Sequence, residues 1–183
     1  MKRILIVITC SWICCFCFAQ TGVLIGDTIA IYKKHNDTQP FFVLQKTAVS
    51  DGLPLHVMGE DNLDFSYYIE GRIIKMRKKM SFVQFNPVGK CPQDIYQLKS
   101  GWIRNEHLGV GVNFHPNLCL YDKPTYQAPS HTQILSPSTY IGQIIGTHNS
   151  WLKISLIIDG TTIQGWLPKN SQCTNMFSIC MGN

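Results

Sequence analysis

Most of the chain alternates short apolar runs with clusters of turn-forming residues, and no long stretch repeats its apolar positions with helical spacing. In the first part of the chain this pattern predicts strands over residues 28–32, 41–45, 53–58, 67–76 and 81–85. A single helical turn is expected near residues 95–98. Many short strands at close spacing predict an all-β barrel or sandwich.

The clearest hairpin lies in the last third of the chain. Trp151 opens a run with aliphatic residues at alternate positions, and Asp159 and Gly160 follow it. An Asp-Gly pair supplies the positive φ angles that a two-residue hairpin turn requires. The second run then leads into Gly165 and Trp166. We therefore expect two antiparallel strands joined by a tight turn.

The first nineteen residues have the pattern of a signal peptide. Lys2 and Arg3 precede an almost entirely apolar stretch over residues 4–18, and small residues stand at the positions before a cut after Ala19. The stretch is shorter than the roughly 20 residues that span a bilayer, so no stable membrane anchor is expected after cleavage. The protein is therefore predicted to be exported, to the periplasm or outside the cell.

Cleavage would remove four of the eight cysteines and leave Cys91, Cys119, Cys173 and Cys180. Four cysteines in an exported chain indicate up to two disulfides. We expect a Cys173–Cys180 bond, because both residues follow the final strand and a chain terminus stays ordered when something ties it down. Cys91 and Cys119 would then be free or bonded to each other. After residue 19 no cysteine or histidine pair has zinc-site spacing, so no metal is expected.

The charge balance is mild. The formal net charge is +5, and loss of the two basic residues of the signal segment lowers it to +3. The densest positive run lies over residues 72–79, where strand geometry would place Lys75, Arg77 and Lys79 on one face. This run indicates either a strip for an anionic polymer or a solvated strand face. No aromatic residue interleaves the charges, so no nucleic acid partner is expected.

Two parts of the chain begin with similar short sequences and also end with similar short sequences. Residues 99–105 and 164–170 share Gly-Trp-aliphatic and end in Asn, and residues 28–34 match 117–123 with Tyr32 and Tyr121 in register. The matches predict two related units. The chain is divided into a signal peptide over 1–19, an N-terminal unit over 20–112 with an inserted hairpin, and a C-terminal unit over 113–183.

The C-terminal unit resembles a bacterial SH3-like domain. Residues 118–124 are similar to the opening strand of that family, residues 140–146 to the strand before its central hairpin, residues 150–154 to its Trp-x-Lys-aliphatic strand and residues 165–167 to its closing strand. The N-terminal unit matches only at its ends. The resemblance implies two tandem SH3-like small barrels. It also implies a second possible disulfide, Cys119–Cys173, because the opening and closing strands of such a barrel are neighbours.

Matched to the aromatic groove of SH3 domains, the resemblance assigns four candidate ligand-binding residues: Tyr121, Trp151, Pro168 and Asn170. Lys123 and Ser171 stand where two further aromatic residues of the groove would be. The resemblance therefore does not imply that this protein binds proline-rich peptides. The resemblance implies contact with peptidoglycan or with a peptide or protein partner. In the other interpretation, Tyr121 and Trp151 only cover the core.

Catalytic patterns are missing from the sequence. The cysteine peptidases that accompany such domains need a thiolate beside a histidine, and none of the four later cysteines has that context. No nucleophile elbow, phosphate loop or cofactor motif occurs. We expect a non-enzymatic, exported SH3-like binding or adaptor protein of the cell envelope. The alternatives are an inhibitor or immunity-type protein that blocks a partner enzyme, and an accessory subunit of a cell-wall hydrolase.

Overall fold

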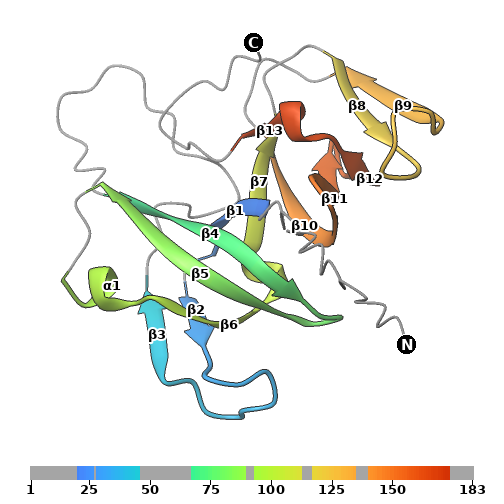
Figure 1. Ribbon diagram of the computed structural model, residues 1–183. Coiled ribbons are helices and arrows are strands. Elements are labelled where there is room, and N and C mark those ends of the chain that lie inside the picture. The colour runs from blue at the N-terminus through green and yellow to red at the C-terminus, as the bar shows by residue number, and fades with distance from the viewer. Residues whose placement is uncertain are drawn as a thin grey trace, which may run out of the picture.

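The computed structural model describes residues 20–26, 28–45, 67–89, 93–112, 117–134 and 140–173. Most of these residues lie in strands, which confirms the predicted all-β class (Figure 1). The strands are β1 (Gln20–Leu24), β2 (Thr28–Ile31), β3 (Phe42–Gln45), β4 (Tyr67–Met76), β5 (Met80–Gly89), β6 (Ser100–Arg104), β7 (Leu108–Val112), β8 (Asn117–Tyr121), β9 (Ser130–Ile134), β10 (Ile141–His148), β11 (Trp151–Ile158), β12 (Thr161–Leu167) and β13 (Gln172–Cys173). The helical elements are α1 (Gln93–Gln97) and two 3₁₀ turns, η1 (Asn105–His107) and η2 (Lys169–Ser171).

One antiparallel sheet joins the two halves of the chain. Its strands follow the order β6-β5-β4-β1-β7-β10-β11-β12-β8-β9, and β13 also pairs with β7, while β2 and β3 form a separate two-stranded sheet. Strand β7 is central, because it pairs with β1 of the first half and with β10 and β13 of the second half (Figure 1). The described pairings do not close into a ring, so the expected tandem barrels are not observed as separate closed barrels.

The pairing pattern of the first half is repeated in the second half. Tyr32 lies opposite Trp102, and Tyr121 lies opposite Trp166, so the residues matched in the sequence occupy equivalent places in the sheet. The β4–β5 ladder shifts register just before Lys75, and the β10–β11 ladder shifts just before Gly146. In each half, the shift falls beside a row of directly opposed residues that crosses the sheet. This row ends at the tryptophan that lies opposite the tyrosine.

A strand, a 3₁₀ turn and a second strand end each half. In the first half these are β6, η1 and β7, and in the second half β12, η2 and β13. Each 3₁₀ turn begins three residues after the tryptophan of its strand, which aligns Asn105 with Lys169. The sequence match between Asn105 and Asn170 is therefore wrong by one residue, because the two asparagines stand at different distances from their tryptophans.

A single cluster of buried aliphatic side chains runs through both halves. All five residues of β7 are buried, and Leu108, Val110 and Val112 belong to this cluster. The inner faces of β10 and β11 add Ile144, Leu152 and other apolar residues. Burial of apolar surface is the main favourable term in folding, so the two halves stabilise each other through a shared core.

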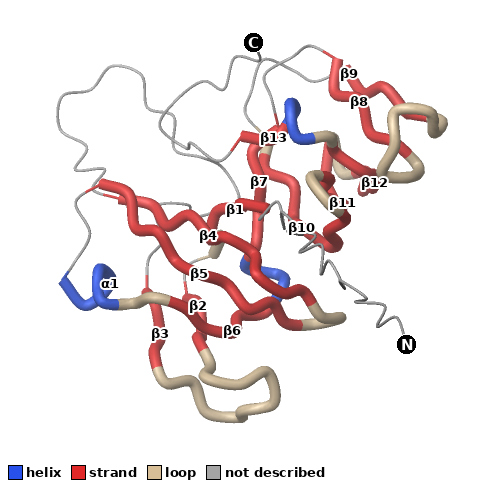
Figure 2. Tube along the Cα trace, in the orientation of Figure 1, coloured by secondary structure: helices blue, strands red, loops and turns tan. Residues whose placement is uncertain are grey.

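The local predictions can be compared with the observed elements. Strands predicted over 28–32, 41–45, 67–76 and 81–85 correspond to β2, β3, β4 and β5, and one short helix lies over Gln93–Gln97 (Figure 2). Asp159 and Gly160 have φ angles of 49° and 75°, as the predicted tight turn requires. The strands that were missed include β1, β7, β9 and β13. The predicted strand over 53–58 and the predicted signal peptide over 1–19 lie outside the described residues.

Candidate functional site

Three aromatic side chains of the second half gather at the end of the β11–β12 ladder. Tyr121 ends β8, Tyr126 lies in the loop between β8 and β9, and Trp151 begins β11. The ring centroids of Tyr126 and Trp151 are 4.8 Å apart, those of Tyr121 and Trp151 are 5.3 Å apart, and those of Tyr121 and Tyr126 are 5.7 Å apart. Every ring thus contacts the other two. These three residues are called the aromatic cluster.

The loop that carries Tyr126 is held by its own hydrogen bonds. The amide of Asp122 donates to the carbonyl of Pro129 at 2.9 Å, and the amide of Thr125 donates to the carbonyl of Lys123 at 2.7 Å. The side chains of Thr125 and Gln127 are also hydrogen-bonded. Backbone bonds of this kind restrict the conformations of a loop, so Tyr126 is presented on a defined turn.

Two glutamine side chains fix the turn that precedes Trp151. The Gln20 amide donates to the carbonyls of Asn149 and Trp151, each at 2.5 Å. The Gln172 amide donates to the carbonyl of Ser150 at 2.9 Å and to that of Leu167 at 3.1 Å. Gln20 comes from the first strand and Gln172 from the last. The turn that carries Trp151 is therefore fastened to both ends of the described chain.

The exposure of the cluster is uneven. Trp151 is 8% exposed, Tyr121 is half-buried and Tyr126 is 61% exposed. Trp151 therefore belongs largely to the interior, as the core-covering interpretation expects, and Tyr126 forms most of the accessible surface. Sequence reasoning missed Tyr126. Its only signal was an aromatic residue within a polar loop.

The other two predicted site residues lie near η2. Pro168 is buried and stands immediately before η2, at the same end of the β11–β12 ladder as Trp151. Its carbonyl accepts a hydrogen bond from the amide of Ser171 at 3.0 Å. Asn170 is exposed within η2. The structure thus brings Tyr121 and Trp151 into direct contact, places Pro168 at the same ladder end, and leaves Asn170 on the surface.

A cysteine lies next to the cluster on β8. Cys119 is a free, half-buried thiol, so the alternative Cys119–Cys173 disulfide is wrong, as is a bond between Cys119 and Cys91. Burial raises the pKa of the Tyr121 hydroxyl above its ordinary value, and a hydrogen bond with Cys119 raises it further. Cys173 is disulfide-bonded, and its partner lies outside the described residues. The Cys173–Cys180 pairing stays a prediction.

Within the described ranges no three histidine, cysteine or acidic side chains are grouped as a metal site would require. No helix in this part of the chain has the length and apolar character to span a membrane.

Comparison with known proteins gives little. No family model matches the sequence, and no curated protein matches it. The structure of NlpC2 from Trichomonas vaginalis is similar over 84% of this chain and 48% of that chain, with 13% sequence identity and a TM-score of 0.29. The chain thus spans about half the length of that structure. A likeness this low carries no argument about fold or function.

Proposed function

We propose that the protein is an exported, non-enzymatic SH3-like binding or adaptor protein of the cell envelope. The ligand of the protein is peptidoglycan, or a peptide or protein partner, and this ligand contacts the aromatic cluster. One observation carries the proposal, namely that Tyr126 is 61% exposed while its ring rests on the buried ring of Trp151. Export rests on the predicted signal peptide over residues 1–19.

Tyrosine and tryptophan suit a binding surface because a flat ring offers a large contact area at a low cost in side-chain entropy. The polar edge of tyrosine can also form a hydrogen bond with the ligand. The turn before Trp151 is already fixed by Gln20 and Gln172. A surface that is ordered before the ligand arrives loses less free energy when it binds.

A sedimentation assay on purified peptidoglycan tests the proposal. We expect the protein to be retained and Tyr126→Ala to lower retention at least about fivefold, since a central aromatic contact commonly contributes 1 kcal/mol or more. Tyr96→Ala is the matched control, because Tyr96 is 43% exposed on α1, far along the chain from the cluster. The control should be retained like the unmodified protein.

The same assay separates the alternatives. Absence of retention, together with one tight protein partner recovered by crosslinking, would favour the inhibitor or immunity-type interpretation. A partner that is itself a cell-wall hydrolase, and whose activity rises on binding, would favour an accessory subunit. Equal retention of the protein and Tyr126→Ala would contradict a role for the cluster.

A further inference from the structure

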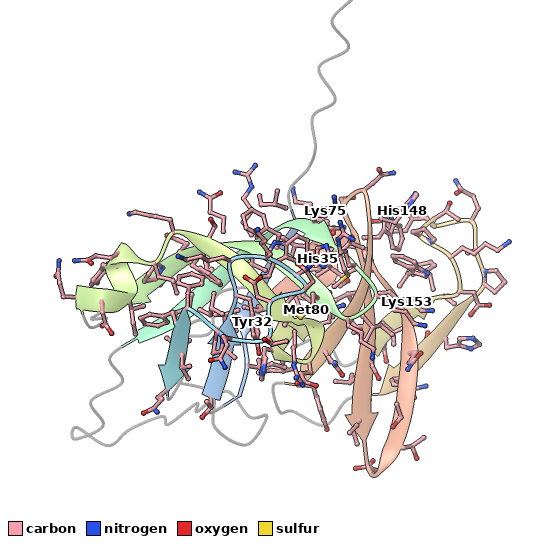
Figure 3. All side chains as sticks on the ribbon, turned by 90° about the horizontal axis from the view of Figure 1, so that it is seen from below. Tyr32, His35, Lys75, Met80, His148 and Lys153 are labelled. Atoms are coloured by element: carbon pink, nitrogen blue, oxygen red, sulfur yellow. The ribbon has the colours of Figure 1, made fainter. Side chains whose placement is uncertain are left out.

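The first half carries a second surface on which aromatic and cationic side chains meet. A row of paired residues crosses β4, β5 and β6 and ends at Tyr32, the residue after β2, with Lys75 opposite Phe82, Phe82 opposite Trp102 and Trp102 opposite Tyr32. Directly opposed residues of antiparallel strands project from the same face of a sheet. Tyr32, His35 and Lys75 are labelled in Figure 3. This surface, formed by Tyr32, His35, Lys75, Arg77, Phe82 and Trp102, is called the cationic face.

Trp102 is the centre of the cationic face. The Arg77 guanidinium carbon lies 5.6 Å from the centroid of the Trp102 ring. The His35 ring meets Trp102 edge-on at 5.3 Å, and the Phe82 ring is tilted against it at 5.5 Å. The indole is therefore occupied by the protein's own side chains. It serves as a platform that holds the guanidinium.

The positive charges of this surface are not neutralised by described carboxylates. Lys75, Arg77, Lys78 and Lys79 are exposed, and none of them belongs to an ion pair within the part of the chain that the structure describes. Residues 77–79 form the turn between β4 and β5, so the predicted strand geometry holds only to Met76. The turn concentrates the charges at one end of the hairpin.

The turn that carries these charges is fixed from outside the hairpin. The side-chain amide of Asn105 donates to the carbonyl of Arg77 at 2.8 Å, and the Asn105 backbone amide donates to the carbonyl of Lys79 at 3.0 Å. The hydroxyl of Ser81, which is fully buried, donates to the Asn105 side-chain oxygen at 2.8 Å. Arg77 is thus held at its backbone by Asn105 and at its guanidinium by Trp102.

We propose that the cationic face binds an acidic peptide segment of a partner protein, at a site separate from the aromatic cluster. An arginine stacked on an aromatic ring keeps its N–H donors available for two parallel hydrogen bonds to a carboxylate. Lys75 stands near the end of β4 and Arg77 in the turn that follows, so both cations lie at the same end of the hairpin. Acidic residues of one extended peptide can therefore meet both cations.

Because other side chains of the protein already contact the Trp102 indole, the cationic face favours some anionic partners over others. Single-stranded nucleic acids bind aromatic platforms by stacking bases on open ring faces. On the cationic face Arg77, His35 and Phe82 already surround the Trp102 ring. Recognition therefore depends on charge and hydrogen bonding, and a peptide with glutamate at alternate positions meets that requirement without stacking.

Fluorescence anisotropy with a labelled peptide of alternating glutamate and alanine tests the proposal. We expect the matching glutamine–alanine peptide to bind at least about tenfold more weakly, and the affinity for the acidic peptide to fall as salt rises. Arg77→Gln should weaken binding about 5- to 10-fold, because it removes a charge-assisted, bidentate contact. Arg77→Lys should give an intermediate loss, since it keeps the charge and loses the planar fork.

Lys123→Gln is the matched control, because it removes an exposed positive charge from the loop of the other half. It should change the affinity by less than about twofold. Equal binding of the acidic and neutral peptides would overturn the proposal, and so would unchanged affinity in Arg77→Gln. Tighter binding of an oligodeoxynucleotide than of the acidic peptide would also overturn it. Tyr126→Ala should leave this affinity unchanged, which separates the result from that of the peptidoglycan assay.

Discussion

Tyr121 is a residue whose chemistry depends on its neighbours. Its ring contacts those of Tyr126 and Trp151, and it lies beside the free thiol of Cys119. Burial disfavours the charged phenolate, so the pKa of its hydroxyl rises above the ordinary value of about 10. The folded protein therefore holds this proton more firmly than the unfolded chain does.

We expect the titration of Tyr121 to lower stability in alkali. Because the folded pKa is raised, the contribution is fully present below the unfolded pKa of about 10 and is lost as pH rises through the folded pKa. Absorbance at 295 nm should show a tyrosine that ionises above the ordinary tyrosine pKa of about 10. Tyr121→Phe should remove this late step. A late step that persists in Tyr121→Phe would contradict the expected shift.

Gly165 lies where packing leaves no room for a side chain larger than hydrogen. A methyl group on Gly165 would lie 2.6 Å from Cβ of Leu120, which is closer than real atoms approach. Gly101 lies in the same way against Ile31, the residue before the other paired tyrosine. The glycine before each tryptophan therefore lets the tyrosine strand approach its partner.

Gly165→Ala should destabilise the protein by about 1–3 kcal/mol, the range for an overpacked core position. Chemical denaturation with a linear extrapolation measures the change. Thr162→Ala, at an exposed position of the same strand, is the control and should change stability by less than about 0.5 kcal/mol. A stable Gly165→Ala protein would show that the β8–β12 contact is looser than described.

At the scale of elements, side-chain amides hold two of the hairpin turns. Asn105 holds the β4–β5 turn, and Gln20 and Gln172 hold the β10–β11 turn. Gln20 is 8% exposed, and its hydrogen bond to the Trp151 carbonyl is buried. A buried carbonyl that loses its donor loses free energy that water cannot restore. These amides therefore link strand ends that are distant in sequence.

Gln20→Ala should lower the free energy of unfolding by about 1–3 kcal/mol, because it leaves the carbonyls of Asn149 and Trp151 without this donor. The matched control is Gln164→Ala, at an exposed position with a hydrogen bond of 3.5 Å to Ser155. Thermal denaturation of the two variants measures the difference. Equal melting temperatures would contradict the role of Gln20.

The sequence predicted elements better than it predicted how they join. Strands with alternating apolar residues, such as β4 and β11, and the Asp159–Gly160 turn follow from local rules. Strand β7 reads Leu-Gly-Val-Gly-Val, and its glycines made it resemble a linker. It is a strand because tertiary pairing on both sides buries all five residues.

The candidate site was predicted only in part, for a related reason. The resemblance to SH3-like domains found Tyr121 and Trp151, whose places are set by strands. Tyr126 lies in a loop without a fixed pattern, and its contact with Trp151 depends on how that loop folds back. The positive charges of the cationic face were found in the sequence, but its aromatic residues were missed, because Phe82 and Trp102 come from strands other than the one carrying Lys75.

At the scale of the whole molecule, β7 makes the two halves depend on each other. Because it pairs with β1, β10 and β13, loss of β7 would leave edges in both halves unpaired. We expect a single cooperative unfolding transition. Hydrogen exchange should give similar opening free energies for core amides of β5 and β11, and Val110→Ala should lower both. Two separate transitions would contradict the shared sheet.

We expect the proposed cell-envelope ligand to bind at the aromatic cluster and not at the cationic face. The predicted cleavage after Ala19 would leave three tryptophans, Trp102, Trp151 and Trp166, and each has an indole N–H that NMR resolves. Soluble peptidoglycan fragments should shift the Trp151 indole signal in a saturable manner and leave the Trp102 signal unchanged. An unchanged Trp151 signal at saturating fragment, or a shift confined to Trp102, would contradict the account.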